Sequence, residues 1–393
     1  MTDTTQHVLV WSCGPVQEFI KAGRKGRDLW FGSWLLSELS RAAALAAMTA
    51  GATLIHPAPR DLAALKNEHF NVSNKLLVLT GTPGAMARAM ETAARERLSA
   101  LFQQVRGKIE KVQRGFSDLK IHWDVAEAQV RDLPEFYWAS APQTKGFAEA
   151  RQVAEAMHAG AKAHRVFKQP PWKSGEKVPK SSLDGARESV VDEKVYGWKE
   201  KGGREHPADE DALRALKLQG KERLCGVGLL KRWGAETQTG GTSGSAVLST
   251  SHVASWTTRK AWDRRPELAS AMQADFAVYI QKLKDLGADL SHTPHWDPVL
   301  KHEDGHVLFE NRLVDVLEED ELKGKQALRE LFSAWKDRVK EHNKTLPKDE
   351  KTTLLPPTPY YAVLVADGDK VGAALDILSK QKDGVEALQH FTR

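Results

Sequence analysis

The sequence predicts an α+β fold in three parts: a ferredoxin-like first domain, a mostly helical and irregular middle domain, and a strand followed by a helix. Three observations predict this. Residues 1–145 place short apolar runs and long helical patterns in the order β-α-β-β-α-β, which is that of a ferredoxin-like unit. Residues 146–342 hold helical patterns and segments rich in Gly, Ser, Pro and Lys. Residues 360–393 open with the apolar run "YYAVLVA" and continue as a helical pattern.

The elements of the first domain follow from these runs. Four apolar runs predict strands at residues 7–12, 52–57, 75–81 and 135–142. After the first strand, Gly14-Pro15 opens a helix that continues toward Met48, since a proline near the first helical position loses no hydrogen bond. A second long helix is predicted over 83–112, again with a proline at its start.

The first of these helices carries an unusual stretch, "CGPVQEFIKAGRKGRDLWFGSWL" (13–35), which mixes basic residues with aromatic residues and glycines. In a continuous helix three of the basic residues share a face and could contact phosphate or a partner. The alternative is a solvated face that pairs internally with Glu18 and Asp28. The basic residues concerned are Lys21, Arg24, Lys25 and Arg27.

The glycines of the same stretch predict close packing. A glycine inside a helix costs about 1 kcal/mol relative to alanine. Gly23 and Gly26 lie on one stripe with Phe19 and Trp30, so we expect another backbone to pack there. This face is expected to be a buried contact rather than a site of chemistry.

The middle of the chain predicts helices joined by loops. Helical patterns cover roughly 208–233, 266–286 and 318–343, and residues 167–190 are a loop or a small irregular module. The segment "NKTLPKDEKTTLLPPTP" is a linker. The expected division is therefore a first domain at 1–145, a middle domain at 146–342, a linker at 343–359 and a last domain that begins at 360–393.

Composition narrows the class of protein. A length of 393 residues suggests two or three domains. With 57 basic and 52 acidic side chains, the net charge of +5 permits a nucleic-acid partner without requiring one. No apolar run approaches a membrane span, and the N-terminus does not resemble a signal peptide. Two cysteines, Cys13 and Cys225, cannot build a disulfide framework, so we expect a reduced, cytoplasmic protein without a membrane partner.

The most distinct chemical feature is the acidic turn Asp367-Gly368-Asp369 at the end of an apolar strand. Two carboxylates there can hold Mg²⁺ against the phosphates of a nucleotide, and glycine permits close approach. The next residue, Lys370, could counter a phosphate charge. The alternative is a turn that caps the following helix, for which aspartate is equally suited.

Four histidines, at positions 292, 295, 302 and 306, are spaced as H-x₂-H and H-x₃-H. Structural zinc sites normally include cysteine, and none is near. We therefore expect loop histidines without a metal.

Together these motifs resemble one family, the large palm-domain subunit of type III-B (Cmr-type) CRISPR effector complexes. "GPVQEFIKAGRKGRDLWFGSWLLSELS" is similar to the signature of that family's first domain, and Asn74 of "NVSNKLLVL" matches an asparagine of its P-N-R-F strand. Further motifs follow in the family's order: "EFYWASAP", "SSLDGARESV", "GKERLCGVGLLKR" and "PYYAVLVADGDKVG".

The resemblance implies two ferredoxin-like palm domains with a cysteine-rich module between them. It also implies partners: sister subunits, a crRNA and an invader target RNA that switches on synthesis of cyclic oligoadenylate from ATP. Asp367 and Asp369 match the acidic motif of the second palm, so they are the expected catalytic residues and ligands of Mg²⁺ or Mn²⁺. Gly368 and Lys370 are expected to lie at the nucleotide.

The sequence departs from the family's pattern in three places. The signature begins at residue 14, so an N-terminal HD nuclease domain is not expected. The two C-x-x-C pairs appear as Ser181-Ser182-Leu183-Asp184 and Cys225-Gly226-Val227-Gly228, so no zinc is expected. The G-G-D-D hairpin of the second palm is absent and is expected beyond Arg393. Alternatives are a stand-alone palm-type nucleotidyl cyclase and a plain RNA-binding protein.

Overall fold

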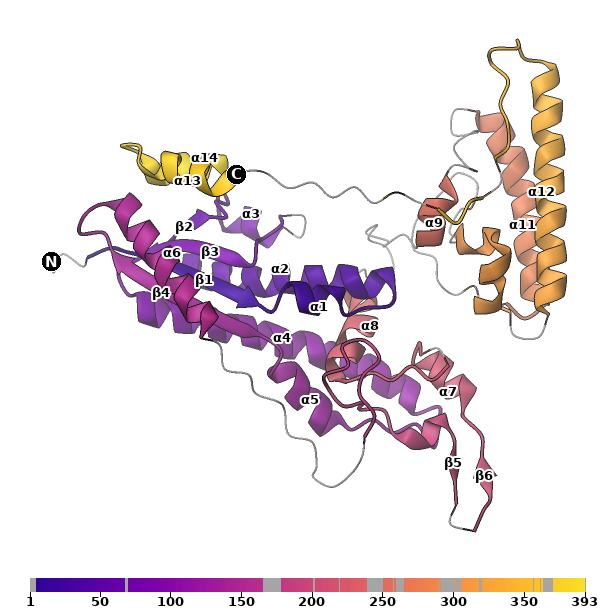
Figure 1. Cartoon of the computed structure of the whole chain (residues 1–393), viewed down its shortest axis with the longest axis horizontal. Coiled ribbons are helices and arrows are strands. Elements are labelled where there is room, and N and C mark those ends of the chain that lie inside the picture. Colours follow the sequence, from indigo (N-terminus) through magenta and orange to yellow (C-terminus); the bar gives the residue numbers. More distant parts are fainter. Residues whose placement is uncertain are drawn as a thin grey trace. The chain divides into compact units, whose positions relative to one another are not determined.

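The computed structural model describes residues 5–67, 70–164, 178–200, 202–218, 220–238, 250–256, 258, 265–288, 290, 300, 305–317, 320–355, 357–360, 362 and 370–392. The chain divides into two compact units (Figure 1). Unit 1 comprises Met1–Thr237 together with Asp367–Arg393, and unit 2 comprises Gln238–Ala366. The predicted domain boundaries at 145, 342 and 359 divide the sequence differently and stay a prediction.

Unit 1 contains an antiparallel sheet of four strands in the order β2-β3-β1-β4. The strands are β1 (His7–Gly14), β2 (Thr53–His56), β3 (Lys75–Thr80) and β4 (Glu135–Pro142). The central strand β1 pairs His7 with Thr80 of β3 and with Pro142 of β4. All four strands lie where the apolar runs predicted them, and the α+β class is confirmed.

One face of the sheet is covered by two long helices, α2 (Gly26–Thr49) and α4 (Pro83–Gln113), which also pack on each other (Figure 1). Alternate residues of β1 point toward them, because successive side chains of a strand face opposite sides. Leu9, Trp11 and Cys13 are buried in this core. It is the largest apolar cluster of unit 1 among the described residues.

The other face of the sheet is covered by α6 (Phe147–Ala163) and by two helices from the end of the chain, α13 (Val371–Ser379) and α14 (Gly384–Phe391) (Figure 1). Gln389 donates a 2.7 Å hydrogen bond to the carbonyl oxygen of Leu54 in β2. Arg151 of α6 forms a 2.7 Å ion pair with Asp376 of α13. Residues far apart in the sequence therefore share this layer.

The continuous helix predicted from Gly14-Pro15 to Met48 is wrong. The chain forms α1 (Gln17–Lys21), leaves the helix, and begins α2 at Gly26. Lys25 is extended, with φ −109° and ψ 145°, and the Asp28 carboxylate accepts hydrogen bonds of 3.2 Å from the backbone N–H groups of Arg24 and Lys25. This carboxylate satisfies donors that a new helix start leaves open, which stabilises the break.

The rest of unit 1 is built from short elements. The helix predicted over 208–233 is two helices, α7 (Glu210–Ala215) and α8 (Gly226–Gln238), separated by a loop. The further elements are α3 (Leu62–Lys66), α5 (Trp123–Arg131), η1 (Glu193–Tyr196), β5 (Trp198–Lys199), β6 (Glu205–His206), α7 (Glu210–Ala215) and α8 (Gly226–Gln238).

Unit 2 is helical in its described residues. Its core lies between α11 and α12, where the Trp335 indole N–H donates a 3.0 Å hydrogen bond to the carbonyl of Met272 and packs near Phe276. Both helices lie where helical patterns predicted them. The elements are α9 (Thr250–Ala254), α11 (Pro266–Asp285), η2 (Gly305–Leu308), η3 (Glu310–Asp315) and α12 (Glu321–Lys344). Across the described part of the chain, no helix has the length and apolar character needed to cross a membrane.

Candidate functional site

Of the predicted catalytic turn, Asp367, Gly368 and Asp369 lie outside the described residues. Lys370 is described and forms the N-cap of α13 with φ 59° and ψ 21°. This left-handed conformation is uncommon for a residue with a Cβ. A helix that begins at Val371 therefore follows the predicted turn.

The predicted basic face is wrong, because the break between α1 and α2 separates its members. Lys21 and Arg24 are exposed, whereas Lys25 is half-buried with its ammonium 3.5 Å from the carbonyl oxygen of Lys217. Burial lowers the pKa of Lys25 to about 8, and the charges of Arg232 and Arg27 act in the same direction. Lys25 thus belongs to the interior of unit 1 and not to an exposed phosphate-binding face.

Asp28 is part of a buried charge network. This network takes the place of the pairing with nearby basic side chains that the sequence suggested. Arg232 of α8 donates hydrogen bonds of 2.9 and 3.1 Å to the two carboxylate oxygens of Asp28. The same guanidinium donates at 2.8 and 3.0 Å to Glu222, and all three side chains are almost completely buried. Burial lowers the pKa of Arg232, but its hydrogen bonds with Glu222 and Asp28 outweigh this and raise it. The guanidinium stays charged, held between two carboxylates.

Lys231, the preceding residue, holds the end of α1. Its ammonium donates hydrogen bonds of 2.6, 3.3 and 2.5 Å to the carbonyl oxygens of Phe19, Ile20 and Ala22. These carbonyls lie where a helix C-terminus leaves acceptors open. Burial lowers the pKa of this lysine to about 8. A Cβ at Gly32 would lie 3.3 Å from its Cε, so Gly32 makes room for it.

The adjacent pair Lys231-Arg232 therefore attaches α8 to the signature stretch. Sequence reasoning missed this role, although two basic residues inside the apolar motif "CGVGLLKRWG" were a signal. Close packing of the signature stretch is found at another glycine: a Cβ at Gly234 would lie 2.2 Å from the Phe31 ring. At Gly23 the nearest atom is Cβ of Asp28, which belongs to the start of α2.

The four positions that the resemblance assigned to zinc ligands are Ser181, Asp184, Cys225 and Gly228, and the Cys225 thiol has hydrogen bonds with the other three, including one with the Ser181 side chain. The Cys225 thiol lies 3.7 Å from Asp184 Oδ2 and accepts a 3.3 Å hydrogen bond from the Gly228 N–H. Asp184 also pairs with Arg187 at 3.2 Å. Four-coordinate structural zinc takes thiolate and imidazole ligands. With one thiol, one carboxylate already paired and a glycine, this set does not fit that metal.

A second polar cluster lies on the α6 face of the sheet. Ser12 of β1 and Nε2 of His158 share a buried hydrogen bond of 2.7 Å, and Lys75 forms an ion pair with Glu155 nearby. Burial lowers the pKa of His158, and the charge of Lys75 lowers it further. Because Ser12 and His158 are both buried, the pair satisfies interior polar groups and is not an accessible nucleophile.

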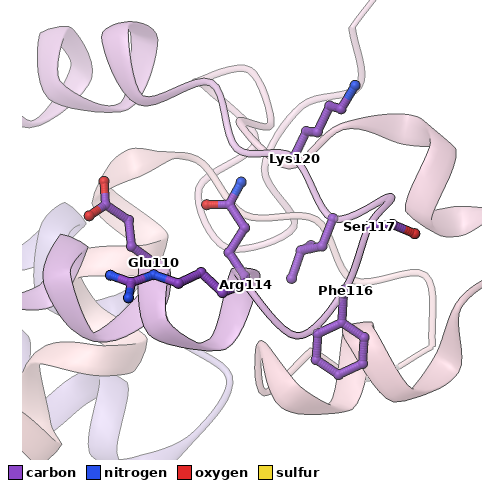
Figure 2. A pocket seen from close by; sticks show the side chains of 7 residues that line it. Glu110, Arg114, Phe116, Ser117 and Lys120 are labelled. Carbon is purple, nitrogen blue, oxygen red and sulfur yellow. The ribbon is translucent and has the colours of Figure 1, made fainter.

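Two of the hollows on the described surface are lined by several charged residues. One, of about 440 Å³, lies at the end of α4 (Figure 2). Figure 2 shows that Glu110 and Arg114 lie on one side of it while Ser117 and Lys120 point elsewhere, so its polar groups do not converge on one point. The other, of about 530 Å³, lies in unit 2 along the end of α12 and is lined by four lysines.

Of the four histidines noted in the sequence, His292, His295 and His302 lie outside the described residues, and His306 lies in η2. No group of three or more His, Cys, Asp or Glu side chains suited to a metal ion occurs where the structure is described.

Comparison with known proteins gives one family match. Residues 8–160 match the family described as CRISPR-associated protein Cmr2, N-terminal, so this part of the chain, from β1 into α6, is Cmr2-like. No curated protein sequence matches the chain.

Solved structures that resemble the chain include two of type III-B Cmr-beta. "Cryo-EM structure of the Type III-B Cmr-beta bound to cognate target RNA" is 14% identical, with a TM-score of 0.54, and the match covers 95% of this chain and 46% of the solved chain. "Type III-B Cmr-beta Cryo-EM structure of the Apo state" is 15% identical, with a TM-score of 0.45, over 67% of this chain and 37% of the solved one. The first likeness concerns the fold, and the chain spans less than half the length of either solved chain.

Proposed function

We propose that this chain acts as a Cmr2-like large subunit of a type III-B CRISPR effector complex. The match of residues 8–160 to the Cmr2 N-terminal family carries the proposal. The likeness in fold to a chain of the Cmr-beta complex, over 95% of this chain, supports it. In this role residues 1–145 provide the first palm domain, and the residues from 360 onward begin a second one.

In such a complex the chain would assemble with sister subunits and a crRNA and respond to invader target RNA. The similar Cmr-beta structure is described as bound to cognate target RNA, which supports RNA as a partner. Affinity for RNA backbones depends on basic side chains. The net charge of +5 is compatible with this role.

The proposed chemistry is synthesis of cyclic oligoadenylate from ATP at the second palm. Asp367 and Asp369 would hold Mg²⁺ or Mn²⁺, since carboxylate oxygens are the ligands that these ions prefer. A metal held by these carboxylates would supply neutralisation of phosphate charge and Lewis-acid activation of the attacking 3′-hydroxyl. Gly368 would allow close approach of the nucleotide, and Lys370 would counter phosphate charge. The sequence holds no G-G-D-D string, so this acidic motif is proposed as one half of the metal site.

For the module around Cys225 we propose that hydrogen bonds replace a zinc ion. The thiol, the Asp184 carboxylate and the Arg187 guanidinium are already connected, so the module has internal cross-links of its own. A metal is then unnecessary for joining the segments around residues 181 and 225.

Co-purification tests the assembly. The tagged chain is expressed with the other subunits of a type III-B complex and a crRNA, and the complex is isolated through the tag. We expect the subunits and the crRNA to co-purify in fixed ratio, whereas an unrelated protein with the same tag retains none of them. Assembly of the other subunits without this chain, while the tagged chain purifies alone, would contradict the proposal.

The catalytic part is tested in a complex that converts ATP to cyclic oligoadenylate when target RNA is added. Asp367→Asn and Asp369→Asn are each expected to abolish the product and leave co-purification of subunits and crRNA unchanged. Asp383→Asn, at the N-cap of α14, is the control and should keep activity. Full activity of the two turn variants would show that these carboxylates do not belong to the metal site.

A further inference from the structure

The hollow at the end of α12 is lined by lysines from two segments. Lys336, Lys340 and Lys344 lie four residues apart on the helix and so share one face, and Lys351 comes from the segment that follows. All four side chains are exposed. We call these four residues and the hollow between them the lysine groove. The sequence predicts Lys336 and Lys340 within the helix at 318–343, and Lys344 and Lys351 within the linker at 343–359.

The groove has a defined shape, because Asn343 fixes the returning segment against the helix. Its side-chain N–H donates a 2.6 Å hydrogen bond to the carbonyl of Thr352, and its side-chain oxygen accepts one of 2.9 Å from the Thr352 N–H. Val339 and Leu354 are buried beneath it. Lys351 is therefore held near the helix face and not on a free loop.

The charge of the groove is poorly compensated. Of the residues described around the hollow, none carries a carboxylate. Lys344 pairs with Glu341 at 2.6 Å, but no ion pair is found for Lys336, Lys340 or Lys351 within the described residues. Like charges four residues apart destabilise a helix. Three lysines that cost stability without forming an ion pair in the described part of the chain are expected where an anionic ligand neutralises them.

The spacing of the lysines favours an extended polyanion over a single small anion. Four residues of helix rise about 6 Å, so the three helical ammonium groups form a row comparable in spacing with successive phosphates of a nucleic-acid strand. Polar groups border the row: Thr353 is exposed, and the apolar members of the lining are buried. Hydroxyl groups are suited to the 2′-hydroxyls of RNA.

We propose that the lysine groove binds the phosphate backbone of single-stranded RNA. The choice of RNA among polyanions rests on the proposed function, whereas the groove and its charge do not. Each lysine contributes a point charge to the backbone, so binding is expected to be largely independent of base sequence and strongly dependent on salt.

The test compares two triple variants of the full chain with equal net charge. Lys336→Gln/Lys340→Gln/Lys351→Gln alters the groove, and Lys66→Gln/Lys162→Gln/Lys284→Gln alters exposed lysines elsewhere. Binding of a labelled single-stranded RNA of mixed sequence is followed by fluorescence anisotropy over a range of salt concentrations. Thermal unfolding of both variants establishes that each is folded.

We expect the groove variant to bind roughly tenfold or more weakly, with a log–log salt slope shallower by about 2 for the three lost contacts. The control variant should bind like the unaltered chain. Equal weakening of both variants, or none in the groove variant, would overturn the proposal. Binding to anionic vesicles and to polyglutamate is measured in parallel. A loss of binding confined to either of these would also overturn the proposal. This binding assay uses the chain without sister subunits, whereas the co-purification experiment requires them. A failure of RNA binding at the groove therefore does not by itself contradict the proposed role as a subunit.

Discussion

Arg232 on α8 and Asp28 at the start of α2 form an ion pair of 2.9 Å in which neither side chain is exposed to solvent. The two residues are 204 positions apart in the sequence. Because the same carboxylate accepts the backbone hydrogen bonds that open α2, the pair links the helix break to α8. The basic signature stretch is therefore shaped by a contact from a distant segment.

Arg232→Met is predicted to destabilise unit 1 strongly. The substitution leaves the carboxylates of Asp28 and Glu222 buried without their cation, and breaking a buried pair in this way typically costs about 3–5 kcal/mol. The free energy of unfolding is measured by urea titration. Lys145→Met, which removes an exposed ion pair with Glu149, is the control and should change it by less than about 0.5 kcal/mol. Similar effects of the two substitutions would show that the buried pair contributes little.

The sequence predicted the four strands of the larger sheet well because each one carries its own local signal. The runs at 75–81 and 135–142 are apolar or aromatic and end at glycine or proline. The break before α2 was missed because it depends on Arg232, which no local pattern connects to Asp28. The cover of the second sheet face was missed for the same reason, since Gln389 bonds to Leu54 across 335 positions.

The two candidate sites, the acidic turn and the lysine groove, also differ in how far the local sequence predicts them. The turn of Asp367 and Asp369 is recognisable from sequence because its strand, turn and helix are contiguous, and it stays a prediction. The lysine groove had a local signal, the K-x₃-K-x₃-K spacing from Lys336 to Lys344. Its opposite wall depends on how Asn343 holds Thr352, which the sequence does not reveal.

Lys25 is predicted to make stability rise with pH. Its pKa falls from 10.5 to about 8 on folding, chiefly through burial. Between these two values the unfolded chain binds the proton that the folded chain has released, so the free energy of unfolding increases with pH in this window. Urea titrations of the wild type and Lys25→Met on both sides of pH 8 measure the effect as a difference, which cancels the other titrating groups. We expect the wild type to gain stability relative to the variant, and a constant difference would contradict the lowered pKa.

Both cysteines are predicted to be unreactive in the folded chain. Burial raises the pKa of Cys225 to about 11 and that of Cys13 to about 12, and the thiolate is the reactive form. A thiol reagent near neutral pH is expected to label neither residue in the native chain and both in urea. Labelling of Cys225 at the rate of an exposed thiol would show that the module around Asp184 opens readily.

Removal of metal ions is predicted to leave unit 1 intact. Ser181, Asp184, Cys225 and Gly228 do not supply a zinc donor set, and hydrogen bonds with the Cys225 thiol connect them. A chelator is therefore expected to leave the thermal midpoint unchanged, and elemental analysis should find far less than one zinc per chain. One bound zinc per chain, together with a lower midpoint in chelator, would contradict the proposed replacement of the metal by hydrogen bonds.

Gly234→Ala is predicted to destabilise the contact between α8 and α2. A Cβ at this position would lie 2.2 Å from Cζ of Phe31, and both helices are fixed nearby by Lys231 and Arg232. Overpacking of this kind costs about 1–3 kcal/mol. Gly107→Ala in α4 is the matched control, because no atom lies within 4 Å of the added Cβ. There the better helix propensity of alanine should stabilise the chain by about 0.5–1 kcal/mol.

The two glycine variants are compared by urea titration, with Phe31→Leu added to the Gly234→Ala chain. Leucine lacks the ring atoms that the new Cβ meets, so the second substitution is expected to cost less stability in the Gly234→Ala chain than in the wild type. This positive coupling follows only if the ring and the glycine are in direct contact. Additive costs of the two substitutions, or stabilisation by Gly234→Ala alone, would show that α8 does not pack against Phe31 this closely.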